Sequence, residues 1–156
     1  MTARTPDAVE IALETPNQPE ALALLTASHA LVASLYPAES NHMLSVAELM
    51  GPGRAFLMAR RGGRAVGCGA VVLDPDGAEL KRMFVPETDR GQGLGRRLLA
   101  AAEAAAWAAG ARVVRLETGV RQPEALGLYR SAGYVERGPF GDYGPDPLSV
   151  FMEKLL

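Results

Sequence analysis

The feature that most constrains this chain is a glycine-rich turn between a predicted strand and a predicted helix. The strand expected at 78–85 leads into the run R-G-Q-G-L-G-R-R at 90–97, which opens an Ala-rich helix expected over 92–109. Glycines at a helix start let the backbone approach an anion closely, and the free N–H groups of the first turn bind it. With its flanking arginines, the turn therefore predicts a site for a phosphate-bearing ligand.

Two familiar phosphate-binding motifs fit this turn poorly. A P-loop needs G-x-x-x-x-G-K-[ST], and no Lys-Ser or Lys-Thr pair follows these glycines. The dinucleotide fingerprint G-x-G-x-x-G also fails, because Gly95 comes one residue early and Arg96 stands where the third glycine should be. The pattern therefore argues against a nucleotide-dependent enzyme.

Two other motifs occur in this chain, one at the turn and one downstream. The turn matches R-x-x-G-x-G through Arg90, Gly93 and Gly95. Farther on, the pattern A-x-x-L-Y-x-x-x-G-[FY] is matched by Ala125, Leu128, Tyr129, Gly133 and Tyr134. In this order the pair resembles the motifs of the GNAT superfamily of N-acetyltransferases, in its small bacterial type of unassigned substrate. The resemblance covers residues 54–156 well and the first third of the chain loosely.

The resemblance implies acetyl-CoA as cosubstrate. The pyrophosphate would lie on the backbone of the turn, and the pantetheine arm would lie along the end of the preceding strand. The implied cofactor-binding residues are Met83, Phe84, Val85, Arg90, Gly91, Gln92, Gly93, Leu94, Gly95 and Arg96. The family often has Asn where Gln122 stands, so no cofactor contact is carried over to that side chain.

Composition predicts a single domain over residues 1–156, because 48% hydrophobic and 22% charged residues are ordinary for a globular chain of this length. A net charge of −2 provides no basic field for nucleic acid. No apolar run reaches the ~18 residues of a membrane span and no signal peptide is recognisable, so we expect a cytoplasmic protein without a membrane partner. One cysteine and two histidines predict no metal site, and Cys68 is expected to be buried. The oligomeric state is left open, a homodimer included.

Hydrophobic patterning predicts an α+β fold. We expect strands at 8–13, 54–60, 65–73, 78–85, 112–118, 134–137 and 148–154, and helices at 20–35, 44–50, 92–109 and 123–132. The strand–helix–strand unit 78–118 is a crossover, so its two strands are parallel, whereas turns such as Gly62-Gly63 indicate antiparallel hairpins. The result is a GNAT-like, mostly antiparallel sheet of six to seven strands with one parallel pair and about four helices. The resemblance implies that this pair is splayed around the pantetheine arm. His29 lies on an apolar helical stripe and is expected in the core.

An irregular pattern marks the strand before the turn. Strict alternation places Leu80, Arg82 and Phe84 on one face and Glu79, Lys81, Met83 and Val85 on the other, so both faces mix charge and bulk. We interpret this as a β-bulge, which the resemblance also implies. The alternative is a strand buried on both faces with snorkelling basic side chains. A bulge would leave backbone N–H groups near Met83 and Phe84 free to bind the thioester carbonyl and the pantetheine amides.

Acetyl transfer needs a base for the amine, donors for the oxyanion and an acid for the departing thiolate. The A-x-x-L-Y match implies that Tyr129 is the acid, although helical periodicity alone favours a core aromatic. Glu79 is a candidate base, with a surface ion pair to Lys81 or an arginine as the alternative. Glu117 is a weaker candidate of the same kind.

The acceptor side is the least readable from sequence. In GNAT proteins the segments corresponding to 36–42 and 138–147 wall the acceptor pocket, and here they supply Asn41, His42, Asp142 and Tyr143 as candidates. Their polar and acidic character suits a cationic amine; alternatively, they cap a helix and form turns. The predicted function is acetyl-CoA-dependent transfer of an acetyl group directly to a primary amine of a small molecule or peptide. The alternative is a non-catalytic acyl-CoA-binding module or sensor of the same fold.

Overall fold

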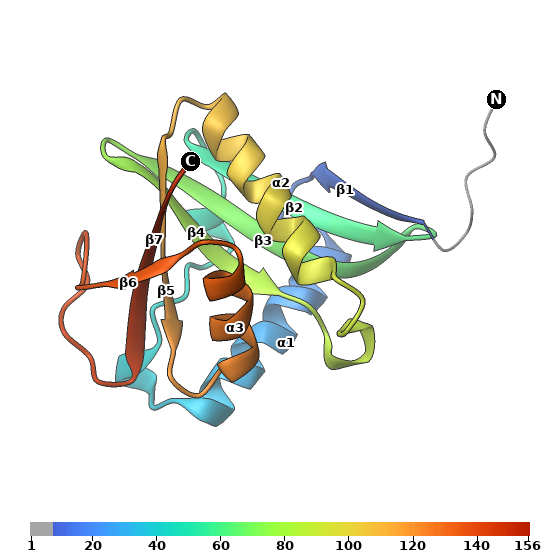
Figure 1. The fold of residues 1–156 in the computed structure, drawn as a ribbon. Helices are drawn as coiled ribbons and strands as arrows, with labels where there is room; N and C mark the ends of the chain where they lie inside the picture. The colour runs from blue at the N-terminus through green and yellow to red at the C-terminus, as the bar shows by residue number, and fades with distance from the viewer. Residues whose placement is uncertain (1–7) are drawn as a thin grey trace.

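Seven strands form one mixed sheet in the order β1-β2-β3-β4-β5-β7-β6 (Figure 1). The computed structural model describes residues 8–156. The strands are β1 (Val9–Leu13), β2 (Arg54–Arg61), β3 (Arg64–Asp74), β4 (Gly77–Phe84), β5 (Val113–Gly119), β6 (Val135–Arg137) and β7 (Ser149–Leu155). The helices are α1 (Pro19–Leu35), α2 (Leu94–Ala108) and α3 (Pro123–Ser131), with 3-10 turns η1 (Ala38–Ser40), η2 (Ala47–Leu49) and η3 (Glu87–Asp89).

The one parallel pair in the described sheet is β4 with β5, as the crossover predicts. Its pairing covers only Ala78–Leu80 against Val114–Leu116. Beyond these residues the two strands lie apart, and β5 pairs on its other side with β7 along its whole length. The predicted splay is therefore confirmed, and it leaves the β5-facing edge of residues 81–84 without a strand partner.

The predicted bulge in β4 is also confirmed. Cys68 is paired with Phe84 and Ala70 with Lys81, so Gly69 lies opposite two residues, Arg82 and Met83. Arg82 has a φ of 54°, a left-handed conformation that is uncommon outside glycine. A Cβ at Gly69 would meet the Met83 Sδ at 3.0 Å, so the glycine makes room for the bulged side chain.

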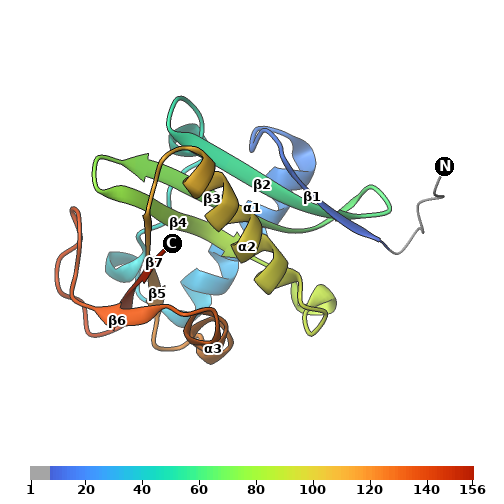
Figure 2. The ribbon, with the colours of Figure 1, turned by 45° about the horizontal axis from the view of Figure 1, so that its top comes forward.

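Helices α2 and α3 lie on one face of the sheet and α1 on the other (Figure 2), and a hydrophobic core lies on each face. The larger core packs α2 and α3 on one face, and α2 contributes Leu94, Leu98, Leu99, Ala102 and Ala106 at helical spacing. The smaller core packs α1 on the other face and includes Cys68, which is buried as expected. Within residues 8–156, no helix combines the length and apolar character needed to cross a membrane.

Two expectations are corrected. The helix predicted at 44–50 is only the 3-10 turn η2, so three α-helices flank the sheet rather than about four. His29 is exposed rather than part of the core. Leucines occur all around α1, so their spacing does not single out a buried face, and the face that packs is Ala21, Leu24, Leu25 and Ser28.

Candidate active site

A groove of about 640 Å³ lies between the end of β4, the start of α2 and helix α3. We call it the cofactor groove. Eight of the ten predicted cofactor-binding residues line it, namely Met83, Phe84, Val85, Arg90, Gly91, Gly93, Leu94 and Gly95. Gln92 and Arg96 are engaged elsewhere: the Gln92 Oε1 accepts from Arg61, and Arg96 donates to the Ser131 Oγ at 2.5 Å. The glycine turn and the strand end thus contribute to one groove, as the motif predicts.

The turn has the geometry of an anion cradle. Gly91 and Gly93 have φ angles of 78° and 76°, which side-chain-bearing residues rarely adopt, and Gly93 is the N-cap of α2. No acidic residue occupies the first turn of α2, so nothing there competes for its N–H groups. Behind the turn, the buried Asp89 accepts from Arg64 at 3.2 Å and holds the connection in place.

Arg90 has a partly structural role. Its Nε donates to the Val85 carbonyl at 2.9 Å, which folds the turn back against the strand end. Its Nη1 lies 3.7 Å from the exposed Glu124 carboxylate, a pair that contributes little to stability. The Arg90 guanidinium therefore lies at the groove with only a weak ionic partner.

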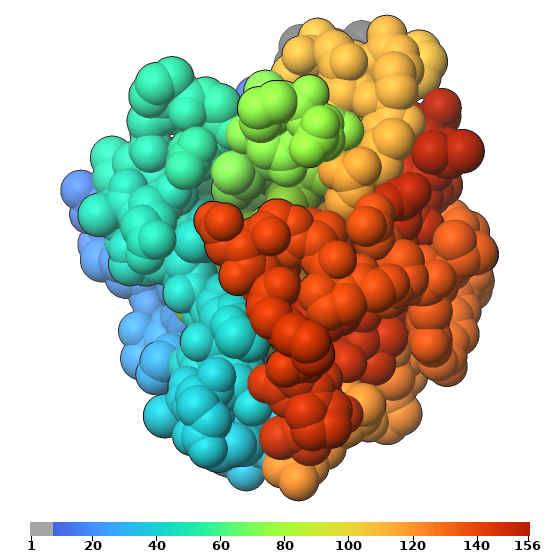
Figure 3. All heavy atoms as spheres, turned by 90° about the vertical axis from the view of Figure 1, so that its left-hand side faces the viewer, coloured from blue at the N-terminus to red at the C-terminus, as the bar shows by residue number. Residues whose placement is uncertain are grey.

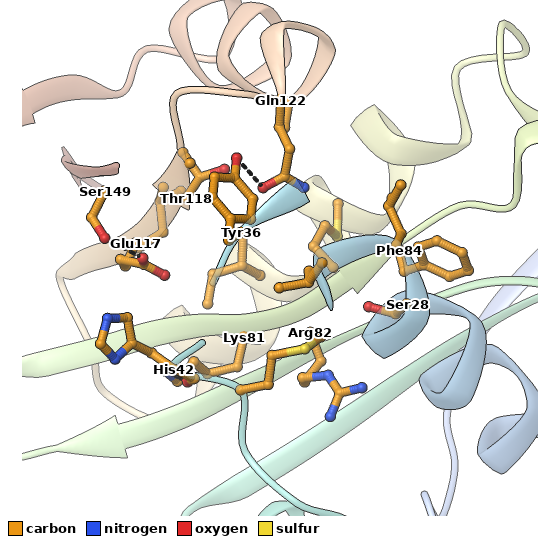
Figure 4. A pocket seen from close by; sticks show the side chains of 18 of the residues that line it. Ser28, Tyr36, His42, Lys81, Arg82, Phe84, Glu117, Thr118, Gln122 and Ser149 are labelled. Carbon is orange, nitrogen blue, oxygen red and sulfur yellow. Dashed lines mark hydrogen bonds between the residues drawn. The ribbon is translucent and has the colours of Figure 1, made fainter. Parts of the chain in front are cut away.

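A smaller cavity of about 120 Å³ lies between the splayed strands β4 and β5 (Figure 4). We call it the inner cavity. Residues 80–84 of β4 and 116–119 of β5 form its sides, α1 and the segment after it form another wall, and α3 closes one end. The two spaces meet at the residues that line both, namely Leu31, Met83, Phe84, Gln122, Ala125 and Tyr129.

Tyr129 lies at this junction. Its side chain is buried, and burial raises the pKa of its hydroxyl well above the ordinary value. The ring packs edge-on against Tyr134 at 5.8 Å, yet within residues 8–156 the hydroxyl has no hydrogen-bond partner. A buried, protonated and unpartnered phenol at the mouth of the groove is suited to donate a proton to a ligand atom.

Glu117 faces the inner cavity from β5 (Figure 4). Burial raises the pKa of its carboxyl, and the hydrogen bond from the Ser149 Oγ, at 2.8 Å, partly offsets this effect. A carboxylate whose pKa is displaced towards neutrality is suited to accept a proton. From the sequence, Glu117 is a weaker candidate base than Glu79. The local pattern does not reveal which of the two side chains faces the cavity, because that depends on how β4 and β5 are aligned.

Glu79 lies instead in an outer groove of about 760 Å³, lined from β4 and the two acceptor-side segments. Its carboxylate pairs with the Lys81 ammonium at 3.1 Å and accepts from the Tyr143 hydroxyl at 2.5 Å. Lys81 also donates to the same Tyr143 hydroxyl. The ion pair with Lys81 that the sequence offered as an alternative is therefore present.

The two acceptor-side segments touch each other over these cavities (Figure 3). His42 lines both the inner cavity and the outer groove, and its ring packs edge-on against Tyr143 at 5.4 Å. Its Nε2 lies 4.0 Å from the Asp146 carboxylate. Asp142 and Tyr143 line only the outer groove, whereas Asn41 lines neither space and its Oδ1 accepts from the Met43 N–H at 3.1 Å.

Sequence reasoning missed a contact that spans the cavity wall. The Tyr36 hydroxyl accepts from the Arg121 N–H at 3.0 Å and donates to the Gln122 Oε1 at 3.2 Å (Figure 4). A Cβ at Gly119 would lie 1.9 Å from this hydroxyl, so only glycine fits there. In the sequence, Tyr36 next to Pro37 indicates only the end of a helix. No local pattern signals a partner 86 residues away.

Comparison with known proteins defines the class. The model of the acetyltransferase (GNAT) domain family matches residues 52–136. The chain is 51% identical to a protein named IAA acetyltransferase from Azospirillum brasilense, over 95% of this chain and 98% of the relative. The chain therefore belongs to the GNAT acetyltransferase family, and it is an N-acyltransferase by class.

Solved structures agree with this assignment. A Klebsiella pneumoniae protein described as a candidate acyl-CoA N-acyltransferase superimposes with a TM-score of 0.82 at 40% identity, covering 95% of this chain and 97% of that one. The PaiA N-acetyltransferase from Thermoplasma acidophilum, solved with coenzyme A, gives a TM-score of 0.72 at 18% identity, with coverage of 96% and 99%. The second likeness supports the fold alone.

Proposed function

We propose that this protein transfers an acetyl group from acetyl-CoA directly to a primary amine. The observation that carries the proposal is the meeting of the cofactor groove and the inner cavity at Tyr129. One space has the anion cradle that a pyrophosphate needs, and the other has a half-buried carboxylate, that of Glu117. The thioester would lie where they join. A GNAT fold solved with coenzyme A and a relative named as an acetyltransferase support the same cosubstrate.

The cofactor would bind through the backbone more than through side chains. The N–H groups of the first turn of α2, after the left-handed Gly93, would hold the pyrophosphate. The pantetheine arm would lie along the edge of β4 that loses its pairing with β5 after Leu80. N–H groups near the bulge at Arg82 and Met83 would then bind the thioester oxygen, a contribution of roughly 3–4 kcal/mol per donor in well-studied enzymes.

The amine must lose a proton before it attacks. An alkyl amine has a pKa near ~10.4, so below about 1% is neutral at pH 7. Of the two candidate bases, Glu117 fits better than Glu79, because it faces the inner cavity while Glu79 is occupied by Lys81 and Tyr143. The neutral amine would attack the thioester carbon, and the tetrahedral intermediate would expel the thiolate of coenzyme A.

Tyr129 would protonate that thiolate. Its hydroxyl has no competing partner within the described chain, and burial raises its pKa, so it is protonated at neutral pH. The same burial would disfavour a thiolate formed beside it and would raise the basicity of that sulfur, which offsets the weaker acidity of the phenol. No covalent enzyme intermediate is needed, and Cys68 is unsuited to be a nucleophile because it is fully buried and burial raises the pKa of its thiol to about 12.

Two measurements test this proposal. Calorimetric titration should show saturable binding of acetyl-CoA, and a ligand at a hundred times its Kd should stabilise the fold by about 2.7 kcal/mol. A thiol-release assay with an amine panel, to which IAA is added because a relative bears its name, should then detect free coenzyme A. Absence of saturable binding would refute the cosubstrate. Binding without thiol release from any acceptor would instead identify a non-catalytic acyl-CoA-binding module.

A further inference from the structure

The charges around the inner cavity restrict what kind of amine can occupy it. Apart from two tyrosines, the titratable side chains that line this space are His42, Lys81, Arg82 and Glu117. Whether each one is free to bind a ligand depends on the partners it already has.

Lys81 has no donor to spare. An ammonium has three N–H groups. In Lys81 the partners are the His42 carbonyl at 3.2 Å, the Glu79 carboxylate at 3.1 Å and the Tyr143 hydroxyl. Its charge is already balanced by Glu79, so Lys81 offers an incoming carboxylate neither a free donor nor an uncompensated charge.

Arg82 is directed away from Glu117 (Figure 4). Its two terminal nitrogens donate to the Leu44 carbonyl at 2.6 Å and the Leu25 carbonyl at 2.8 Å, which ties α1 to the segment before η2. Its Nε has no partner among the described residues, but it is buried and a ligand cannot reach it. Arg82 therefore fixes the wall of the cavity and does not present its charge to the contents.

His42 also has neighbours within the described chain. Its Nε2 lies 4.0 Å from the Asp146 carboxylate, and its ring is covered by Tyr143. Glu117 is in the opposite situation, because its hydrogen-bond partner in the described chain is the neutral Ser149 hydroxyl. The inner cavity thus presents an acid without a bonded cation, whereas the exchangeable donors of Lys81 and the terminal nitrogens of Arg82 are already bonded and His42 has the Asp146 carboxylate beside it.

The rest of the lining carries no charge and mixes apolar side chains with neutral hydroxyl and amide groups. Leu31 and Val32 come from α1, Met43 from the following segment and Leu148 from the residue before β7. The volume of about 120 Å³ is well below the range of about 300–1,000 Å³ typical of pockets for drug-sized ligands. The space suits a small body with a single positive end.

We propose that the acceptor is a small amine whose only charge is its ammonium group, with an uncharged alkyl or arylalkyl body. Amines that also carry a carboxylate, amino acids included, would be poor acceptors. A carboxylate in this cavity would lose its water, find no free cation and lie near the like charge of Glu117. The inference rests on the proposed acetyl transfer and narrows its substrate.

The test uses the unmodified protein and three acceptors that share one apolar body. Phenethylamine lacks a carboxylate, phenylalanine carries one, and phenylalanine methyl ester has the same α-substituent without its charge. With acetyl-CoA saturating, kcat/KM is measured by thiol release. We expect the amine and the ester each to exceed the amino acid by at least about tenfold, the factor expected for one unsatisfied buried charge. The amine of the ester is less basic than that of phenylalanine and the amine of phenethylamine is more basic, so a deficit of phenylalanine against both cannot come from basicity.

Each other outcome has a defined meaning. A phenylalanine value equal to or above that of phenethylamine overturns the proposal. Spermidine and a lysine-containing peptide are run in parallel. Thiol release with these two but not with the arylalkyl amines overturns the acceptor class while acetyl transfer stands. No thiol release with any acceptor, despite saturable acetyl-CoA binding, overturns both.

Discussion

Replacing Tyr129 by phenylalanine should separate catalysis from stability. The substitution removes one hydroxyl and keeps the ring that packs against Tyr134. If this hydroxyl protonates the thiolate, its loss removes general acid catalysis, which contributes about 10²–10⁴-fold in rate. We therefore expect kcat to fall by about a hundredfold or more, with little change in the Kd of acetyl-CoA.

The same substitution should not weaken the fold. The Tyr129 side chain is largely buried, and its hydroxyl has no hydrogen-bond partner among residues 8–156. The hydroxyl is not fully enclosed, however, since the Arg82 Nε is the one enclosed side-chain nitrogen or oxygen without a partner in that range. Because the substitution breaks no hydrogen bond and keeps the ring, the free energy of unfolding of Tyr129→Phe should equal that of the parent.

Tyr134 provides a matched control. It is buried beside Tyr129, and its hydroxyl donates to the Glu103 carboxylate at 2.8 Å. Tyr134→Phe should lose about 1–2 kcal/mol of stability, because a hydrogen bond to a charged group is removed, and should keep its kcat. Urea unfolding and thiol release on both variants give opposite rankings if the reasoning is right. A kcat for Tyr129→Phe within about threefold of the parent, or an equal loss in both variants, would refute it.

Three further substitutions test other parts of the site. In the parent, we expect kcat/KM to rise with pH above the ordinary carboxyl range, because the pKa of Glu117 is raised. Glu117→Gln should abolish this rise, and a variant that keeps it would exclude Glu117 as the base. Because the pKa of Glu117 is higher in the folded than in the unfolded state, the parent loses stability as the pH rises through that interval. Glu117→Gln does not titrate, so relative to the parent it should be more stable at pH 8 than at pH 4. Gly119→Ala should lower the free energy of unfolding by at least about 1–3 kcal/mol, since its Cβ would lie 1.9 Å from the Tyr36 hydroxyl. The control Gly127→Ala in α3 should raise it by about 0.5–1 kcal/mol. Equal effects of the two substitutions in thermal unfolding would contradict the clash. Gly93→Ala should weaken acetyl-CoA binding in calorimetry. Gly110→Ala is the control: its φ of 99° is also in the left-handed region and its Cβ would also meet open space, but it lies past the opposite end of α2, so it should leave the Kd unchanged.

Sequence reasoning succeeded where the signal is local. The glycine turn and the bulge each follow from residues within a few positions of one another, and the crossover follows from the order of consecutive elements, so these features could be predicted from spacing and alternation. Even the bulge at Arg82 was visible, because charge and bulk shared both faces of one strand.

The roles of single side chains were less predictable, because long-range contacts decide them. Glu79 is occupied through a hydroxyl 64 residues away on Tyr143, and Arg96 through Ser131, 35 residues away. The same limit hid the contact between Tyr36 and Gln122. A motif places a residue near a site, but the packing of distant segments decides whether its side chain faces the ligand.

The most direct test of the account is a crystal structure of this protein with coenzyme A bound. We predict that the pyrophosphate contacts the backbone N–H groups at the start of α2 and that the sulfur lies within hydrogen-bonding distance of the Tyr129 hydroxyl, where the two cavities meet. A cofactor bound outside the groove, or a sulfur beyond reach of that hydroxyl, would contradict it.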